Sequence, residues 1–127
     1  MEYQGGIIEI SDSVLKEIVF RSAVEYMDLE NHPKEQKKLR KNIGLQRTPE
    51  DHLIITLKIA VPFKIKDKRN QIPEYVGNLM KKIKEDIERM TEMKIETIKV
   101  KVEEIVEKFE MGEEEEAEEE EENEGNA

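Results

Sequence analysis

The chain has 127 residues, a formal net charge of −10 and no cysteine. Its length suits one domain, and the absence of thiols excludes a disulfide framework, a thiolate zinc site and a cysteine nucleophile. The charge is uneven, because residues 110–127 hold 11 Glu and no Lys or Arg, which leaves 20 acidic and 21 basic residues in 1–109. We therefore predict a near-neutral folded domain at 1–109 and a disordered Glu-rich tail at 110–127, too poor in apolar side chains to offset the entropy of ordering.

The first part of the domain shows a strand pattern, a helix pattern and a polar stretch in turn. Three isoleucines at 7–10 follow a pair of glycines and predict a first strand. Ser11 stands where a helix N-cap belongs, and apolar residues recur at helical spacing over 15–26, which predicts an amphipathic helix ending near Asp28. The Lys-rich segment 31–42 is interpreted as a long exposed connection.

The second part contains the clearest strand of the sequence. Over 53–63, six apolar side chains occupy every second position and therefore share one face of the strand. This strand is expected to pair with 43–48 as a hairpin. A second amphipathic helix is predicted over 73–91, opened by a first-turn proline. A last strand alternates over 98–103, with a kink expected at 96–97 because the preceding isoleucine is out of phase.

This β-α-β-β-α-β order predicts an α+β, two-layer domain in which two amphipathic helices cover one face of a four-stranded sheet. The opposite face then presents Lys58, Lys99, Lys101 and Thr56 to solvent. The simplest interpretation is a solvated face whose lysines also discourage edge-to-edge pairing. The alternative is that these four residues form an interaction surface.

The sequence offers no set of catalytic residues. His32 and His52 have no spaced partner that suggests a metal pair or a proton relay, and the three serines all belong to the first helix or its cap. The Gly5-Gly6 pair lacks the frame of a phosphate-binding loop, and the Glu-rich tail lacks the spacing of a calcium loop. We therefore expect no enzymatic activity, no cofactor and no metal site.

A nucleic-acid interface is a second hypothesis for the lysine-bearing sheet face, to which segment 34–41 would add positive charge. Sheet-face RNA binders stack bases on aromatic side chains. Aromatic residues make up only 5% of this chain, and none is interleaved with these lysines. An RNA- or ribosome-associated binding module, with the Glu-rich tail as an internal competitor, therefore remains the less favoured alternative.

Nothing in the sequence predicts direct insertion into a membrane. The N-terminal residues lack the basic region and long apolar stretch of a secretory signal. The longest mostly apolar run, 53–61, is far shorter than the ~20 residues that span a bilayer. We therefore expect a cytoplasmic protein.

Two segments resemble signature motifs of the alkaline shock protein family of bacterial general-stress proteins. Residues 6–15 have the sequence GIIEISDSVL and resemble the strand-to-helix unit that opens the family's domain. Residues 90–102 have the sequence MTEMKIETIKVKV and resemble the helix-to-strand unit that closes it. The resemblance covers about residues 5–105 with the elements in order. Glu92 is a departure, because the family usually has glycine there, at a helix C-terminus that tolerates a positive φ.

The resemblance implies a non-enzymatic protein of the stress response and cell-envelope homeostasis, acting as a scaffold or protein-interaction module. It also implies a homo-oligomer and, for some members, a position near the membrane through a membrane-associated protein partner. It carries over no catalytic residues. Our leading hypothesis is therefore a scaffold that contacts other proteins through the sheet face.

Overall fold

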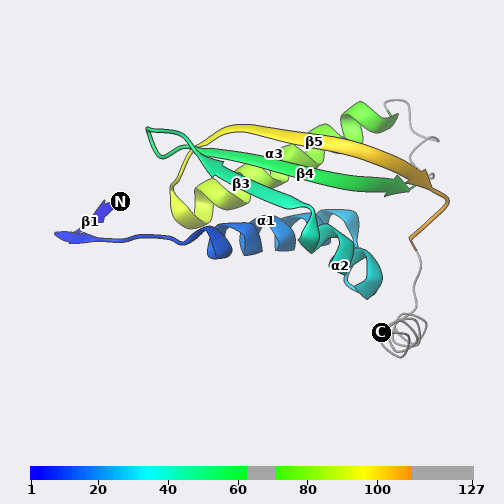
Figure 1. Cartoon of the computed structure of the whole chain (residues 1–127), viewed down its shortest axis with the longest axis horizontal. Coiled ribbons are helices and arrows are strands. Elements are labelled where there is room, and N and C mark those ends of the chain that lie inside the picture. Colours follow the sequence, from blue (N-terminus) through cyan, green and yellow to red (C-terminus); the bar gives the residue numbers. More distant parts are fainter. Residues whose placement is uncertain (63–70, 110–127) are drawn as a thin grey trace, which may run out of the picture.

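The structure is a computed structural model that describes residues 1–62 and 71–109 (Figure 1). Its elements in chain order are β1 (Glu2–Tyr3), β2 (Gly6–Ile7), α1 (Asp12–Met27), α2 (Pro33–Lys41), β3 (Ile43–Arg47), β4 (Leu53–Pro62), α3 (Gln71–Thr91) and β5 (Ile95–Val106). The predicted α+β class is confirmed, with helices and strands mixed along the chain. The predicted Glu-rich tail lies outside the described residues.

The main sheet has the strand order β3-β4-β5. β3 and β4 form the predicted antiparallel hairpin, and β5 returns parallel to β4 after the crossover through α3. The predicted kink in the last strand is confirmed as a shift of register. Leu53 pairs with Ile95 and the next residue, Ile54, pairs with Thr97, which leaves Glu96 bulged.

The expected four-stranded sheet is wrong for the described residues, because the first strand does not join the others. β2 pairs instead with β1, as a separate two-stranded sheet. Gln4 and Gly5 both have positive φ, which suits the tight turn of such a hairpin. Pairing across a two-residue turn closes a very short loop, so it competes well with a distant sheet edge. The main sheet therefore has three strands.

The expected exposed connection at 31–42 is also wrong, because α2 occupies most of it. Pro33 is the first helical residue, where its missing N–H has no helical partner to lose. Leu39 is buried in the core, and the guanidinium of Arg40 lies 3.8 Å from the centre of the Phe20 ring. One buried side chain in two turns leaves no apolar stripe, so periodicity could not reveal this helix.

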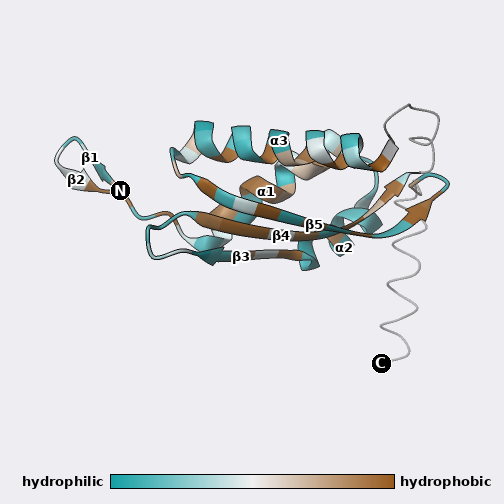
Figure 2. Cartoon of the chain, turned by 90° about the horizontal axis from the view of Figure 1, so that it is seen from above, coloured by the Kyte–Doolittle hydropathy of each residue, from teal (hydrophilic) through white to brown (hydrophobic). Residues whose placement is uncertain are grey.

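The core lies between the main sheet and helices α1 and α3, which contact each other along their length. Figure 2 shows α3 running alongside the sheet, and Figure 1 shows it passing behind the strands. The alternation in β4 buries the apolar side chains of one face against these helices. Ten side chains are almost fully buried: Leu15, Val19, Leu29, Leu53, Ile55, Leu57, Val61, Leu79, Ile83 and Ile87.

The helix ends follow the caps expected from the sequence. The Oγ of Ser11 accepts a hydrogen bond from the backbone N–H of Val14, at 3.3 Å. α1 ends before Asp28, which adopts a left-handed conformation with φ 60°. α3 ends before Glu92, which has φ 62°. No helix within the described part of the chain is long and apolar enough to cross a bilayer.

Candidate interaction surface

The structure brings the four predicted surface residues together. Thr56 and Lys58 alternate with buried residues in β4, so they lie on the face of the sheet that points away from the core. The parallel register places Thr56 beside Lys99 and Lys58 beside Lys101. All four residues are exposed. We call this set the lysine ladder.

The ladder concentrates positive charge on the exposed face of β4 and β5. Neighbouring strands lie about 4.8 Å apart, so Lys58 and Lys101 place two like charges opposite each other, which is unfavourable without a counter-charge. Glu103 supplies a weak one, with its Oε2 3.9 Å from the Nζ of Lys101. Lys58 stands on the central strand β4, whose other face is buried, and Lys99 and Lys101 stand on the edge strand β5.

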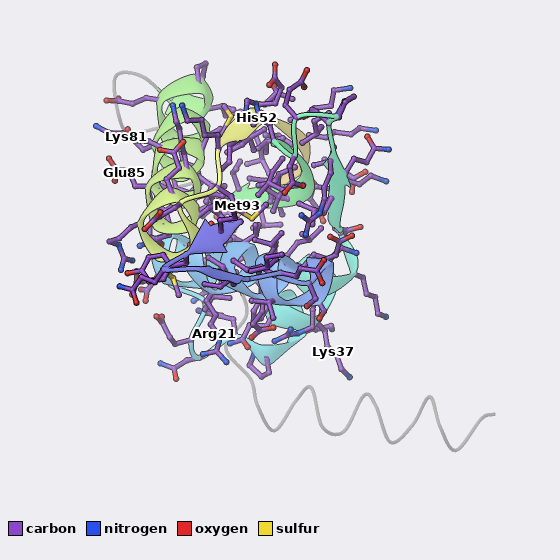
Figure 3. All side chains as sticks on the ribbon, turned by 90° about the vertical axis from the view of Figure 1, so that its left-hand side faces the viewer. Arg21, Lys37, His52, Lys81, Glu85 and Met93 are labelled. Carbon is purple, nitrogen blue, oxygen red and sulfur yellow. The ribbon has the colours of Figure 1, made fainter. Side chains whose placement is uncertain are left out.

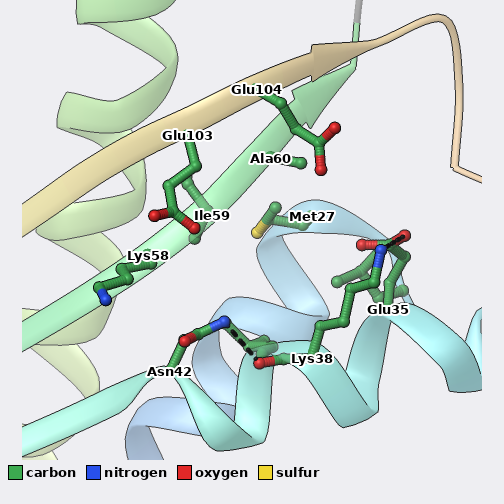
Figure 4. A pocket seen from close by; sticks show the side chains of 11 residues that line it. Met27, Glu35, Lys38, Asn42, Lys58, Ile59, Ala60, Glu103 and Glu104 are labelled. Atoms are coloured by element: carbon green, nitrogen blue, oxygen red, sulfur yellow. Dashed lines mark hydrogen bonds and ion pairs between the residues drawn. The ribbon is translucent and has the colours of Figure 1, made fainter.

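Acidic side chains flank the ladder near α2. A register shift after Ile59 interrupts the alternation of β5, so that Ala60 pairs with Glu104 and Glu103 is bulged. Figure 4 shows both glutamates with Lys58 around a small cavity between these strands and α2. This acidic edge was not predicted from the sequence, although two adjacent glutamates in an alternating strand are a signal of a bulge.

The cavity itself is too small for a ligand of ordinary size. Its volume is about 60 Å³, whereas small-molecule sites are typically ~300–1,000 Å³. Asn42 closes one side, where its Nδ2 donates a hydrogen bond to the carbonyl oxygen of Lys38 at 2.9 Å. Among residues 1–62 and 71–109, no three His, Asp or Glu side chains come together in a way that could hold a metal ion.

His52 has a partner that its sequence neighbours do not reveal. Its Nδ1 lies 3.1 Å from the Oε1 of Glu96, the bulged residue of β5. The two residues are 44 positions apart in the chain, so no spacing rule could have joined them. The pair is partly exposed, and such surface pairs contribute little to stability.

A polar network with perturbed pKa values lies between the helices, away from the ladder. The Oγ of Ser22 on α1 donates to the Oδ2 of Asp86 on α3 at 2.6 Å, and Lys82 bridges Asp86 and Glu25. Burial raises the pKa of Asp86, but the hydrogen bonds from Ser22, Lys82 and Arg89 outweigh it and hold that pKa below its usual value. This network ties α1 to α3.

Comparison with known proteins supports the resemblance of the two motif segments. The profile of the alkaline shock protein 23 family, which is described by a cell envelope-related function, matches residues 1–107. No curated protein and no solved structure gave a significant match. The matched range includes the β1–β2 hairpin, the three helices of the described residues and the main sheet. The chain therefore belongs to the alkaline shock protein 23 family, whose function is related to the cell envelope.

Proposed function

We propose that the protein is a non-enzymatic scaffold of the stress response at the cell envelope, and that it binds partner proteins through the lysine ladder. The family supplies the relation to the cell envelope. One observation supports the finer proposal, namely that three exposed lysines occupy successive positions on the same face of two paired strands. The partner would be a protein with an acidic surface, which in the cell could be associated with the membrane.

Glu103 compensates the positive charge of the lysine ladder only in part. A partner carboxylate placed between Lys58 and Lys101 would relieve their repulsion and form charge-assisted hydrogen bonds. Such complementary charges mainly set specificity and the rate of association. The neighbouring glutamates would repel a partner in the wrong register, because like charges facing each other are unfavourable.

Charge reversal tests this proposal. We expect the triple variant K58E/K99E/K101E to lose capture of partner proteins while keeping its fold, because all three side chains are exposed. Capture on immobilised full-length protein, followed by far-ultraviolet circular dichroism of each variant, measures both quantities. If the triple variant still captures the same partners, the ladder is not the binding surface.

A matched control variant makes the same change of net charge at three exposed lysines on the helices. These lysines are Lys16 on α1 and Lys81 and Lys84 on α3. Figure 3 shows Lys81 on the outer side of α3, away from the sheet. The K16E/K81E/K84E variant should retain partner capture. Equal loss in both triple variants would indicate a general effect of net charge and would contradict a specific ladder.

RNA binding is the second candidate, favoured by the position of α2. Its basic residues lie next to the ladder, because Lys38 and Lys58 line the same cavity. This candidate predicts RNA affinity that falls steeply between 50 and 200 mM salt and rises when residues 110–127 are removed. Fluorescence anisotropy with single-stranded RNA measures it. Absence of binding by the truncated protein at low salt would eliminate this candidate.

A further inference from the structure

Four lysines of α2 lie on the side of the helix that faces away from the core. They recur at i, i+3, i+4 and i+7 and therefore share one face. They are Lys34, Lys37, Lys38 and Lys41, and we call them the lysine stripe. Leu39, the buried residue of α2, projects from roughly the opposite side of the helix. Figure 3 shows Lys37 pointing away from the domain.

The lysine stripe gives α2 an excess of positive charge. Lysines three or four positions apart on a helix are neighbours, and like charges at that spacing destabilise the helix. Glu35 is the one acidic residue of α2, and its Oε2 lies 3.7 Å from the Nζ of Lys38. Arg40, the remaining basic residue, binds Glu17 of α1 and lies over the ring of Phe20. Binding of an anion along the stripe would therefore stabilise α2.

The end of the described domain lies beside the beginning of α2. Phe109 is the last described residue and is buried. Its ring centre is 5.9 Å from that of His32, the N-cap residue of α2. Figure 1 shows the chain turning from the end of β5 toward α2. Residues 110–127 therefore start next to the helix that carries the lysine stripe.

Residues 110–127 have the charge and the length to cover the stripe. They contain 11 Glu and no Lys or Arg, with uninterrupted glutamate at 113–116 and 118–122. The nine residues of α2 make a helix about 14 Å long. An extended chain advances ~3.3 Å per residue, so the first glutamate run can reach about 13–23 Å from Phe109, which spans the helix. Because both runs are glutamate throughout, the contact needs no particular register.

We propose that the Glu-rich tail, residues 110–127, binds the lysine stripe of α2 in the same molecule and keeps other polyanions away from it. A tether that starts beside the helix raises the effective concentration of the tail to about the millimolar range, so weak ion pairs suffice. This docking surface is distinct from the lysine ladder, because the stripe lies on α2 and the ladder on β4 and β5.

Paramagnetic broadening in nuclear magnetic resonance spectra of the full chain tests the docking. The chain has no native cysteine, so Ala117→Cys provides a single attachment point for a spin label between the two glutamate runs. We expect the amide signals of 34–41 to lose most of their intensity at low salt. The signals should largely recover at ~1 M salt, where the Debye length falls to ~3 Å.

A variant of the stripe separates docking from mere proximity of the tail. K37Q/K38Q/K41Q removes three exposed charges while keeping residues of good helix propensity. This variant should lose most of the broadening of 34–41. A tail that is tethered but not docked would broaden the same signals equally in this variant and at both salt concentrations, and that result would overturn the proposal.

A matched control removes the same net charge at Lys16, Lys81 and Lys84, which are exposed on the other two helices. K16Q/K81Q/K84Q should retain the broadening of 34–41. Equal loss in both triple variants would indicate a general effect of net charge and would overturn docking on the stripe.

A mixed sample shows which molecule supplies the tail. It contains isotope-labelled chains without the spin label and unlabelled chains that carry it. We expect the signals of 34–41 to keep their intensity in this mixture. Broadening as strong as in the singly labelled chain would show that the tail of a second copy binds the stripe, and it would overturn the proposal.

Neutralising the tail tests whether it keeps other polyanions from the stripe. In the full chain with Glu→Gln at every position of 113–116 and 118–122, single-stranded RNA should bind more tightly than it binds the wild type. Adding K37Q/K38Q/K41Q should then lower the slope of log affinity against log salt by ~2, because three phosphate contacts are lost. An unchanged affinity for RNA after neutralisation, or an unchanged slope in the stripe variant, would overturn the shielding.

Discussion

Replacing Glu92 by glycine should stabilise the protein. Glu92 follows α3 with φ 62°, and its backbone N–H donates to the carbonyl oxygen of Glu88 at 2.9 Å. The left-handed conformation costs a side chain with a Cβ about 1–2 kcal/mol. Glycine relieves that strain but gives the unfolded chain more entropy, which offsets about 0.5–1 kcal/mol. The net expectation is a free energy of unfolding higher by about 0.5–1 kcal/mol, or about 2–5 °C in Tm for a domain of this size.

Urea unfolding followed by circular dichroism measures this difference directly. Glu92→Ala is the control for the lost carboxylate, because alanine keeps the Cβ and therefore keeps the strain. Glu85→Gly is the control for position, because it lies on an exposed part of the α3 interior and should destabilise by about 1 kcal/mol. If Glu92→Gly is no more stable than Glu92→Ala, the strain argument is refuted.

Three further expectations follow from packing and charge. The pKa of Asp86 is below its usual value of 3.8, so its stabilisation is present above about pH 4 and is lost as the pH falls through the lowered pKa. Asp86→Asn should therefore lower the free energy of unfolding by about 1–3 kcal/mol at pH 7 and by much less at pH 2.5, in urea titrations; an equal loss at both pH values would contradict this. Gly77→Ala, inside α3 with open space at its Cβ, should raise Tm by a few degrees, and a lower Tm would be the adverse result. Gly44→Ala should lower Tm because a Cβ there would clash with the hydroxyl of Thr56, and Thr56→Ala should restore part of the loss; no rescue in the double-mutant cycle would show that the clash is not the cause.

Much of the fold can be predicted from short stretches of sequence, because strand alternation and helix capping depend on residues that are close together in the chain. The alternation of β4 identifies its buried face without any partner, since successive side chains of a strand always point to opposite sides. Ser11 caps α1 through a hydrogen bond to a residue only three positions away. Ile95, the out-of-phase first residue of β5, marks the bulge at Glu96. The same alternation places the lysines of the candidate surface on the exposed face.

The remaining features depend on contacts between distant residues. α2 is held to the domain by Leu39, which is buried in the core. The sequence of α2 has no periodic apolar pattern that would have predicted this helix. Residues 1–10 do not join the main sheet because β1 pairs with β2 and because Arg47, 37 residues from Ile10, donates a hydrogen bond to the carbonyl oxygen of Ile10.

Sequence alone therefore determined the α+β class, the caps, the buried face of β4 and the side on which the ladder lies. Only the tertiary structure decided that Thr56 lies beside Lys99 and Lys58 beside Lys101, because that pairing depends on the register of two parallel strands joined through α3. It also decided that the main sheet has three strands within the described residues. The alternation of a strand and the cap of a helix depend on residues within one strand or one turn. The register of paired strands and the choice of strand partners depend on which distant segments are buried against each other.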